Sequence, residues 1–129
     1  VKLFDKGRAP GGRLATRRTP EGLRFDHGAQ YIRAGGASFR AALVEAGAEA
    51  WPDPARLVGV PGMSALPRAL AAGLDVTCGV TVSRLTRETA GWFVEGEGPF
   101  DSALLTVPAP QAIPLAPAFA EQLSRSRYA

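Results

Sequence analysis

Apolar residues recur at helical spacing in the first half of the chain and at strand spacing in the second half. The clearest helical run consists of Phe39, Ala42, Leu43 and Ala46. It predicts a helix over residues 38–50, in which Ser38 caps the start and Gly47 weakens the far end. A shorter helix is predicted over residues 64–72, where Gly73 would end it.

Strand-like sequence appears at the start of the chain and again in its second half. Single strands are predicted at residues 1–4, 74–82 and 103–107. The last of these is a continuous apolar run, which is typical of a strand buried on both faces in a parallel sheet. Residues 85–95 alternate between apolar and polar positions around Gly91 and predict a β-hairpin.

The tail after the last strand is predicted to be helical, but only in pieces. Residues 109–129 contain Pro110, Pro114 and Pro117, which interrupt a helix because proline lacks the N–H group of the hydrogen-bond ladder. The whole pattern predicts an α/β fold in which strands from both ends of the sequence join one sheet. The middle of the chain would form an excursion from that sheet.

The composition is that of an ordinary globular domain, with 46% hydrophobic and 21% charged residues. The formal net charge is +3, but the basic residues form two groups with acidic residues between them. The groups are Arg8, Arg13, Arg17 and Arg18 near the start, and Arg125 and Arg127 near the end. This pattern argues against a nucleic-acid partner. No apolar run reaches the roughly 18 residues of a membrane span and no signal peptide is seen, so we expect a cytoplasmic protein that binds no membrane.

The chain holds one cysteine and one histidine. Cys78 has no partner for an internal disulfide and is expected to be a small buried residue in a strand. Since His27 has no other histidine or cysteine near it in the sequence, we expect no metal site. A lone histidine more often orients a loop than performs catalysis, and the sequence identifies no catalytic residue.

The strongest chemical signal lies just after the first strand. In doubly wound nucleotide-binding folds a strand ends in an acidic residue that accepts hydrogen bonds from ribose hydroxyls, and Asp5 stands in such a place. Gly11 and Gly12 lack a Cβ atom, so their backbone can approach a ligand and donate N–H groups. Arg8 and Arg13 flank them and suit a diphosphate. The alternative is a plain turn followed by solvated arginines.

Four short motifs follow one another along the chain. They are FDKGR with GGRLAT (residues 4–16), FDHGAQY (25–31), VGVPGMS (58–64) and FD with VPAPQ (100–111). In this order they resemble segments of the renalase-like branch of the flavin-containing amine oxidases. The resemblance covers nearly the whole chain. It implies part of an FAD/NAD(P)-binding Rossmann-like domain with part of an inserted α+β substrate domain.

The resemblance also implies a division of the chain into three parts. Residues 1–35 would belong to the FAD-binding portion, with the second Rossmann strand, the GGR loop and the DHGAQY segment. Residues 36–73 would be a partial substrate-domain excursion. Residues 74–129 would return to the FAD-binding domain with a β-hairpin, a buried strand and a helical tail. FAD is the implied cofactor.

Individual residues receive cofactor-binding roles from the same resemblance. Asp5 would bind the adenosine ribose, and Gly12 and Arg13 would contact the pyrophosphate. Residues 28–30 would run beside the isoalloxazine, where small residues are needed because the ring packs against the backbone. The full set of implied cofactor-binding residues is Asp5, Lys6, Arg8, Gly11, Gly12, Arg13, Asp26, His27, Gly28, Ala29, Gln30, Tyr31, Val82, Val107 and Pro108.

Three members of this set lie far along the chain. By resemblance, the backbone of Val82 would pair with the adenine, and Val107 and Pro108 would close over the adenosine side. In the segment that would form the shelf for the flavin, Phe25 and Tyr31 are expected to be apolar anchors.

Two segments of the family pattern are missing from this sequence. A flavin fold of this type needs Gly-x-Gly-x-x-Gly at the start of a helix, whereas residues 96–98 precede Pro99 and read as a turn. The C-terminal segment that completes the flavin site is missing as well. The chain is therefore expected to be a fragment, with apolar sheet edges at Leu3 and Leu105 that favour self-association.

The function implied by the resemblance is that of an FAD-dependent oxidoreductase. It would transfer hydride from a carbon next to nitrogen to the flavin, with O2 as the acceptor. The substrate would be a small molecule, either an amine or a dihydronicotinamide-type compound. Two alternatives stay open, namely an inactive truncated fragment and a small anion- or nucleotide-binding module without catalysis.

Overall fold

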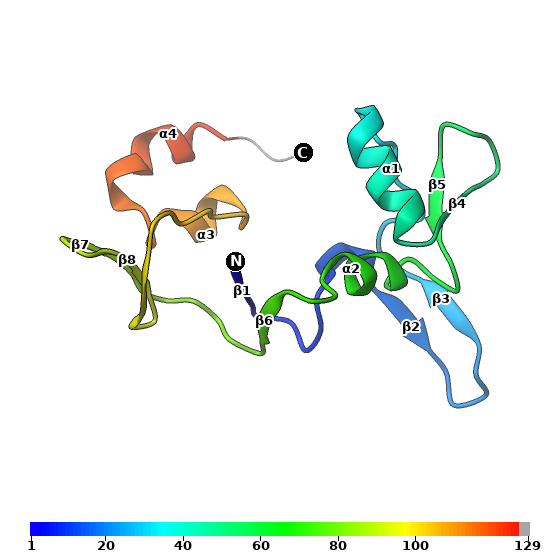
Figure 1. Cartoon of the computed structure of the whole chain (residues 1–129), viewed down its shortest axis with the longest axis horizontal. Coiled ribbons are helices and arrows are strands. Elements are labelled where there is room, and N and C mark those ends of the chain that lie inside the picture. Colours follow the sequence, from blue (N-terminus) through cyan, green and yellow to red (C-terminus); the bar gives the residue numbers. More distant parts are fainter. Residues whose placement is uncertain (127–129) are drawn as a thin grey trace. The chain divides into compact units, whose positions relative to one another are not determined.

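The computed structural model describes residues 1–126, and the chain divides into two compact units, residues 1–80 and 81–129 (Figure 1). The first unit contains β1 (Lys2–Asp5), the 3-10 turn η1 (Gly12–Leu14), β2 (Thr16–Arg18), β3 (Arg24–Asp26), α1 (Ala37–Glu45), β4 (Ala48–Ala50), β5 (Leu57–Gly59), α2 (Ala65–Leu70) and β6 (Asp75–Cys78). The second contains β7 (Leu85–Glu88), β8 (Gly91–Val94), β9 (Glu97–Phe100), α3 (Ala109–Ala112), η2 (Pro117–Phe119) and α4 (Ala120–Ser124). The class is mixed α/β, as predicted.

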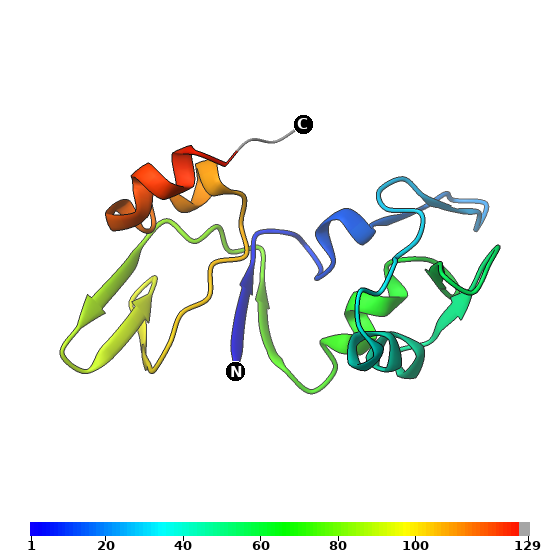
Figure 2. The ribbon, with the colours of Figure 1, turned by 90° about the horizontal axis from the view of Figure 1, so that it is seen from above.

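The first and last strands of the first unit form a parallel pair. β1 and β6 lie side by side (Figure 2), with Lys2 opposite Asp75 and Asp5 opposite Cys78. Because a parallel pair needs a long crossover connection, the chain between these strands forms an excursion from them. Cys78 lies in a strand as predicted, but it is half-buried rather than fully buried.

The prediction of a buried strand at residues 103–107 is wrong. These residues form no strand, because the described part of the chain supplies no neighbouring strand to pair with them. The strands of the described residues form four separate small sheets instead of one. Of the two leucines expected to be exposed, Leu3 is 40% exposed, whereas Leu105 is half-buried and its neighbour Leu104 is 89% exposed.

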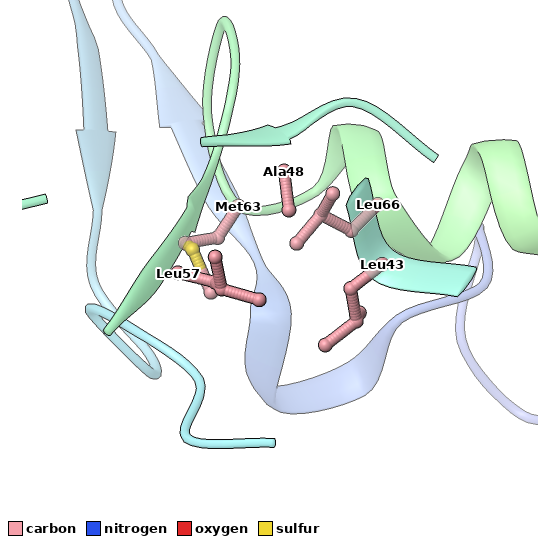
Figure 3. Packing of buried hydrophobic residues seen from close by; sticks show 5 residues of the cluster. All are labelled: Leu43, Ala48, Leu57, Met63 and Leu66. Carbon is pink, nitrogen blue, oxygen red and sulfur yellow. The ribbon is translucent and has the colours of Figure 1, made fainter. Parts of the chain in front are cut away.

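The core of the first unit lies in the excursion, not at the parallel strands. Five buried side chains meet there (Figure 3): Leu43, Ala48, Leu57, Met63 and Leu66. They come from α1, β4, β5, the turn before α2 and α2 itself. Burial of one large apolar side chain stabilises a fold by roughly 1.5–3 kcal/mol, so this cluster fixes α2 against α1 and the β4–β5 hairpin.

Helix α1 is shorter than predicted. It ends at Glu45, and Gly47, with φ of +91°, turns the chain into strand β4. A positive φ is easy only for glycine, which is why the helical pattern does not continue through residues 48–50. The predicted cap is also wrong, since Ser38 lies inside the helix and Gly36 takes the N-cap position. The shorter predicted helix is confirmed as α2.

Strands β2 and β3 form an antiparallel hairpin in which Thr16 lies opposite Asp26. Both side chains contact the backbone at the start of α2. Because successive side chains of a strand alternate between faces, Phe25 faces away from that contact and is 54% exposed. The prediction that Phe25 and Tyr31 are apolar anchors is therefore wrong, as Tyr31 is also 42% exposed.

The second unit contains a three-stranded antiparallel sheet in the order β7-β8-β9. The predicted hairpin is confirmed as β7 and β8. Residues 96–98, predicted as a turn, lie partly in strand β9. The turn comes one residue earlier, at Glu95 and Gly96, which have φ of +51° and +87°.

The tail of the second unit is helical in short pieces, as predicted, and residues 127–129 of that prediction lie outside the described residues. Pro110 does not interrupt a helix, because it lies in the first turn of α3, where the missing N–H costs no hydrogen bond. Pro117 begins the short turn η2. Within residues 1–126, none of the helices has the length and apolarity that crossing a membrane requires.

Candidate nucleotide-binding site

Two adjoining cavities open in the first unit. The larger, the loop cavity, has a volume of about 620 Å³ and lies between the loop after β1, strand β2 and the start of α2. The smaller, the hairpin cavity, has a volume of about 230 Å³ and lies between β2, β3 and α2. The residues that line both cavities are Thr16, Arg18, Ser64 and Arg68.

Arginine supplies the permanent charge of both linings. Arg8, Arg17, Arg18 and Arg68 line the loop cavity, and Arg24 joins the last two at the hairpin cavity. Across residues 1–126, none of these arginines forms an ion pair, and neither Asp nor Glu lines either cavity. Like charges that share a cavity repel, so the potential in both cavities favours an anionic ligand.

The two glycines of the loop serve different purposes. A Cβ atom on Gly11 would lie 2.6 Å from Cγ of Pro67, so Gly11 permits close packing of the loop on α2. A Cβ atom on Gly12 would meet nothing within 4 Å. Gly12 lines the loop cavity with φ of +45°, and its backbone is therefore the one that a ligand can approach.

Asp5 stands at the end of β1 and shapes the beginning of the loop. Its Oδ1 accepts a hydrogen bond from the Gly7 N–H at 2.7 Å, and the Gly7 carbonyl accepts one from the Gly79 N–H at 2.8 Å. The carboxylate thus directs the chain out of the strand and toward the loop cavity, which Gly7 lines.

A small polar cluster holds the hairpin against the start of α2. The Thr16 hydroxyl donates a hydrogen bond to Oδ1 of Asp26 at 2.5 Å, and the same Oδ1 accepts the Met63 N–H at 3.0 Å. The Ser64 N–H donates to Oγ1 of Thr16 at 3.0 Å. This cluster, the Thr16–Asp26 clamp, positions β2, β3 and α2 relative to one another, and these elements carry Arg18, Arg24 and Arg68.

Gly28 and Ala29 pack on the backbone of Arg13. The Ala29 N–H donates to the Arg13 carbonyl at 2.8 Å, and a Cβ atom on Gly28 would lie only 1.9 Å from that oxygen. The requirement for glycine at position 28 therefore has a cause inside the fold, independent of any ligand. The contact fixes the far end of the loop that begins at Asp5.

The sequence-predicted site residues are spread over three environments. Four line the loop cavity: Arg8, Gly11, Gly12 and His27. The others of the first unit do not line it: Asp5, Lys6, Arg13, Asp26, Gly28, Ala29, Gln30 and Tyr31. Val82, Val107 and Pro108 belong to the second unit. Arg13 is exposed, and its backbone rather than its side chain makes the hydrogen bond just described.

Several residues that line the cavities were not predicted as site residues from the sequence: Thr16, Arg17, Arg18, Arg24, Ser64 and Arg68. A signal for part of this set existed, since Arg17 and Arg18 belong to the basic group recognised near the start of the chain. Arg68 gave no such signal, because its place in the linings depends on the packing of α2 against a hairpin that ends more than forty positions earlier.

Residues 1–46 match the family model described as an NAD(P)-binding Rossmann-like domain. Domains of this family occur in FAD-dependent oxidoreductases, where they bind nucleotide cofactors. The match spans β1, the loop, the β2–β3 hairpin and α1, and it includes most residues that line the loop cavity. The match agrees with the Rossmann-like character predicted for this segment.

Proposed function

We propose that this chain supplies part of the FAD site of an oxidoreductase of the amine-oxidase type, as its motifs suggest. One observation carries the proposal. The loop cavity combines the open backbone of Gly12 with four arginines that form no ion pair within residues 1–126, and most of its lining lies in the segment that matches a nucleotide-binding family. A diphosphate needs positive charge and close backbone N–H groups together, and the loop cavity offers both.

The loop cavity fits a dinucleotide in size as well as in charge. Ligand sites commonly have volumes of about 300–1,000 Å³. The loop cavity, at about 620 Å³, falls in that range. In this proposal Arg8, Arg17 and the Gly12 N–H would bind the diphosphate. Asp5, whose Oδ1 already accepts the Gly7 N–H, would offer its other oxygen to a ribose hydroxyl.

FAD, when bound, supplies the acceptor for hydride from a C–N bond of the substrate, and O2 would reoxidise it. The part of this chain in that reaction is to bind and orient the cofactor. Ser64 and His27 both line the loop cavity, but within residues 1–126 no hydrogen bond joins them, and no pair of carboxylates lines either cavity. A role in positioning fits such a lining better than a role in acid–base catalysis.

The test is a titration of the purified 129-residue chain with FAD, followed by flavin fluorescence, with ADP and inorganic phosphate as competitors. We expect FAD to bind and ADP to compete with it, because the diphosphate is the common element. Replacement of Arg8 or Arg17 by alanine should weaken FAD binding roughly tenfold each, since a charged hydrogen bond is lost. The control is Arg125→Ala, which removes an exposed arginine paired with Glu121 in the second unit.

Two outcomes would overturn the proposal. The first is an FAD affinity that Arg8→Ala and Arg17→Ala leave unchanged. The second is displacement of FAD by inorganic phosphate as effective as its displacement by ADP, which would indicate a general anion-binding module. A titration with NADP⁺ in place of FAD would show which of the two cofactors the chain prefers. In this proposal FAD should bind more tightly, because only FAD places a flavin beside residues 28–30.

A further inference from the structure

The hairpin cavity shares Arg18 and Arg68 with the loop cavity but also contains Arg24, which the FAD proposal does not use. It is lined by Arg18, Arg24 and Arg68, which come from β2, β3 and α2, together with Ser64 and small or apolar residues. Its volume of about 230 Å³ lies below the range of about 300–1,000 Å³ that is usual for whole ligands. It is suited to one charged group rather than to an entire dinucleotide.

The arrangement of its arginines is unfavourable for the protein alone. Arg18 and Arg24 are direct cross-strand partners in the β2–β3 hairpin. Like charges in that relation destabilise a sheet. Arg68 adds a third guanidinium to the same lining. In the described chain, no carboxylate pairs with any of the three.

The framework around these arginines is well fixed. The Thr16–Asp26 clamp joins the hairpin to the start of α2 through two hydrogen bonds, and a third links Thr16 to Asp26 within the hairpin. Gly62 packs so closely on the hairpin that a Cβ atom there would lie 2.9 Å from Oγ1 of Thr16. Asp26 uses its Oδ1 for two bonds of the clamp. The elements that carry the three arginines are thus joined by contacts that do not neutralise these side chains.

We propose that the hairpin cavity is a binding site for the phosphate group of a second ligand, distinct from the nucleotide in the loop cavity. Three guanidinium forks match a dianionic phosphate with several acceptor oxygens better than a carboxylate, which has one charge and two oxygens. The same charges repel a protonated amine. The ligand would therefore be a phosphate monoester, and the Ser64 hydroxyl would add a further donor to it.

The lining residues allow the two sites to be separated by single substitutions. Arg24 lines only the hairpin cavity, whereas Arg8 and Arg17 line only the loop cavity. The probes are inorganic phosphate and glycerol 3-phosphate, titrated by calorimetry into the chain in which Arg8 and Arg17 are both alanine. Binding that remains in that background and depends on Arg24 reports on the hairpin cavity.

We expect Arg24→Ala to weaken the binding of both probes about tenfold, since one charged hydrogen-bond donor is lost, and Arg24→Lys to weaken it less. FAD affinity, measured with Arg8 and Arg17 intact, should be unchanged by Arg24→Ala. Acetate should bind more weakly than either probe. The melting temperature of each variant verifies folding, and Arg125→Ala again serves as the control.

Two results would overturn this site. One is phosphate binding that is independent of Arg24. The other is competition between phosphate and FAD together with an equal loss of both on Arg24→Ala, which would assign the hairpin cavity to the nucleotide. If FAD fails to bind while phosphate binding still depends on Arg24, the FAD proposal fails and the phosphate site stands.

Discussion

The arginines of the second unit and those that line the two cavities of the first unit have different surroundings. In the second unit, the Arg87 guanidinium lies 5.2 Å from the centre of the Trp92 ring, and Arg125 pairs with Glu121. In the first unit, five arginines line two cavities and, within residues 1–126, none has an acidic partner. Arg87 and Arg125 thus make contacts inside the second unit, whereas the charges of the cavity arginines are not neutralised by the protein and can attract an anionic ligand.

The first unit also separates its framework from its ligand-facing groups. Thr16, Asp26 and Gly28 make contacts inside the fold, and the arginines project from the elements that these contacts hold. This separation can be tested, because changes to the framework should lower stability, while changes to the cavity arginines should alter binding with little or opposite effect on stability.

The largest effect is expected for Gly28→Ala. The added Cβ would lie 1.9 Å from the Arg13 carbonyl oxygen, so the backbone must shift and the Ala29 N–H bond to that oxygen is strained. We expect a loss of about 3 kcal/mol in the free energy of unfolding, measured with urea. The matched control is Gly12→Ala, which meets nothing within 4 Å and should cost only about 1 kcal/mol for its positive φ. Equal losses for both would show that the contact of Gly28 is unimportant.

A somewhat smaller loss is expected for Asp26→Ala. It removes the acceptor of the Thr16 hydroxyl and of the Met63 N–H, and should lower the free energy of unfolding by about 2 kcal/mol. Asp26→Asn keeps an oxygen in place and should lose about half as much. Since the clamp positions Arg68 against the hairpin, phosphate binding should weaken in both variants in proportion to the loss of stability. Unchanged stability of Asp26→Ala would mean that the clamp does not hold α2.

Arg24→Glu, in contrast, is expected to raise the free energy of unfolding. The new carboxylate faces Arg18 across the hairpin, so a repulsive pair becomes an attractive one. Favourable cross-strand pairs contribute about 0.2–1 kcal/mol, and we expect a rise of that size in the free energy of unfolding together with loss of phosphate binding. Arg24→Gln, which removes the charge without adding another, should fall between the two. A destabilised Arg24→Glu variant would remove the reason to regard these arginines as reserved for a ligand.

The sequence made the β1 strand, its terminal Asp5 and the Gly-Gly loop recognisable because these features are local. The strand follows from a short apolar run and the loop from its glycines. The same local reasoning failed at residues 103–107, where an apolar run suggested a buried strand. Burial of a strand depends on neighbours, and a run of side chains carries no information about whether those neighbours are present.

The site was predicted less completely for the same reason. Gly11 and Gly12 look equivalent in sequence, yet only the packing of α2 shows that Gly11 serves the fold and Gly12 the cavity. Arg24 and Arg68 are ordinary exposed residues of a strand and a helix until the Thr16–Asp26 clamp brings their elements together. Contacts between residues distant in sequence decide which charges share a cavity, and a single sequence does not reveal them.

The smallest effect is expected in the second unit, for Glu95→Gln. The Glu95 carboxylate accepts hydrogen bonds from the N–H groups of Ser83 and Arg84, at 2.5 and 2.7 Å, and these bonds hold the pKa of Glu95 below its ordinary value. Because the folded-state pKa is lowered, the stabilisation is fully present above the ordinary carboxyl pKa and is lost as the pH falls through the folded value.

The measurement is the melting temperature of the wild type and of Glu95→Gln between pH 7 and pH 3. The difference between them should be small at pH 7, because the carboxylate is exposed, and should disappear at low pH, where both side chains are neutral. FAD and phosphate binding should be the same in both proteins at pH 7. A change in binding would show that Glu95 takes part in binding, a role that neither proposal gives it.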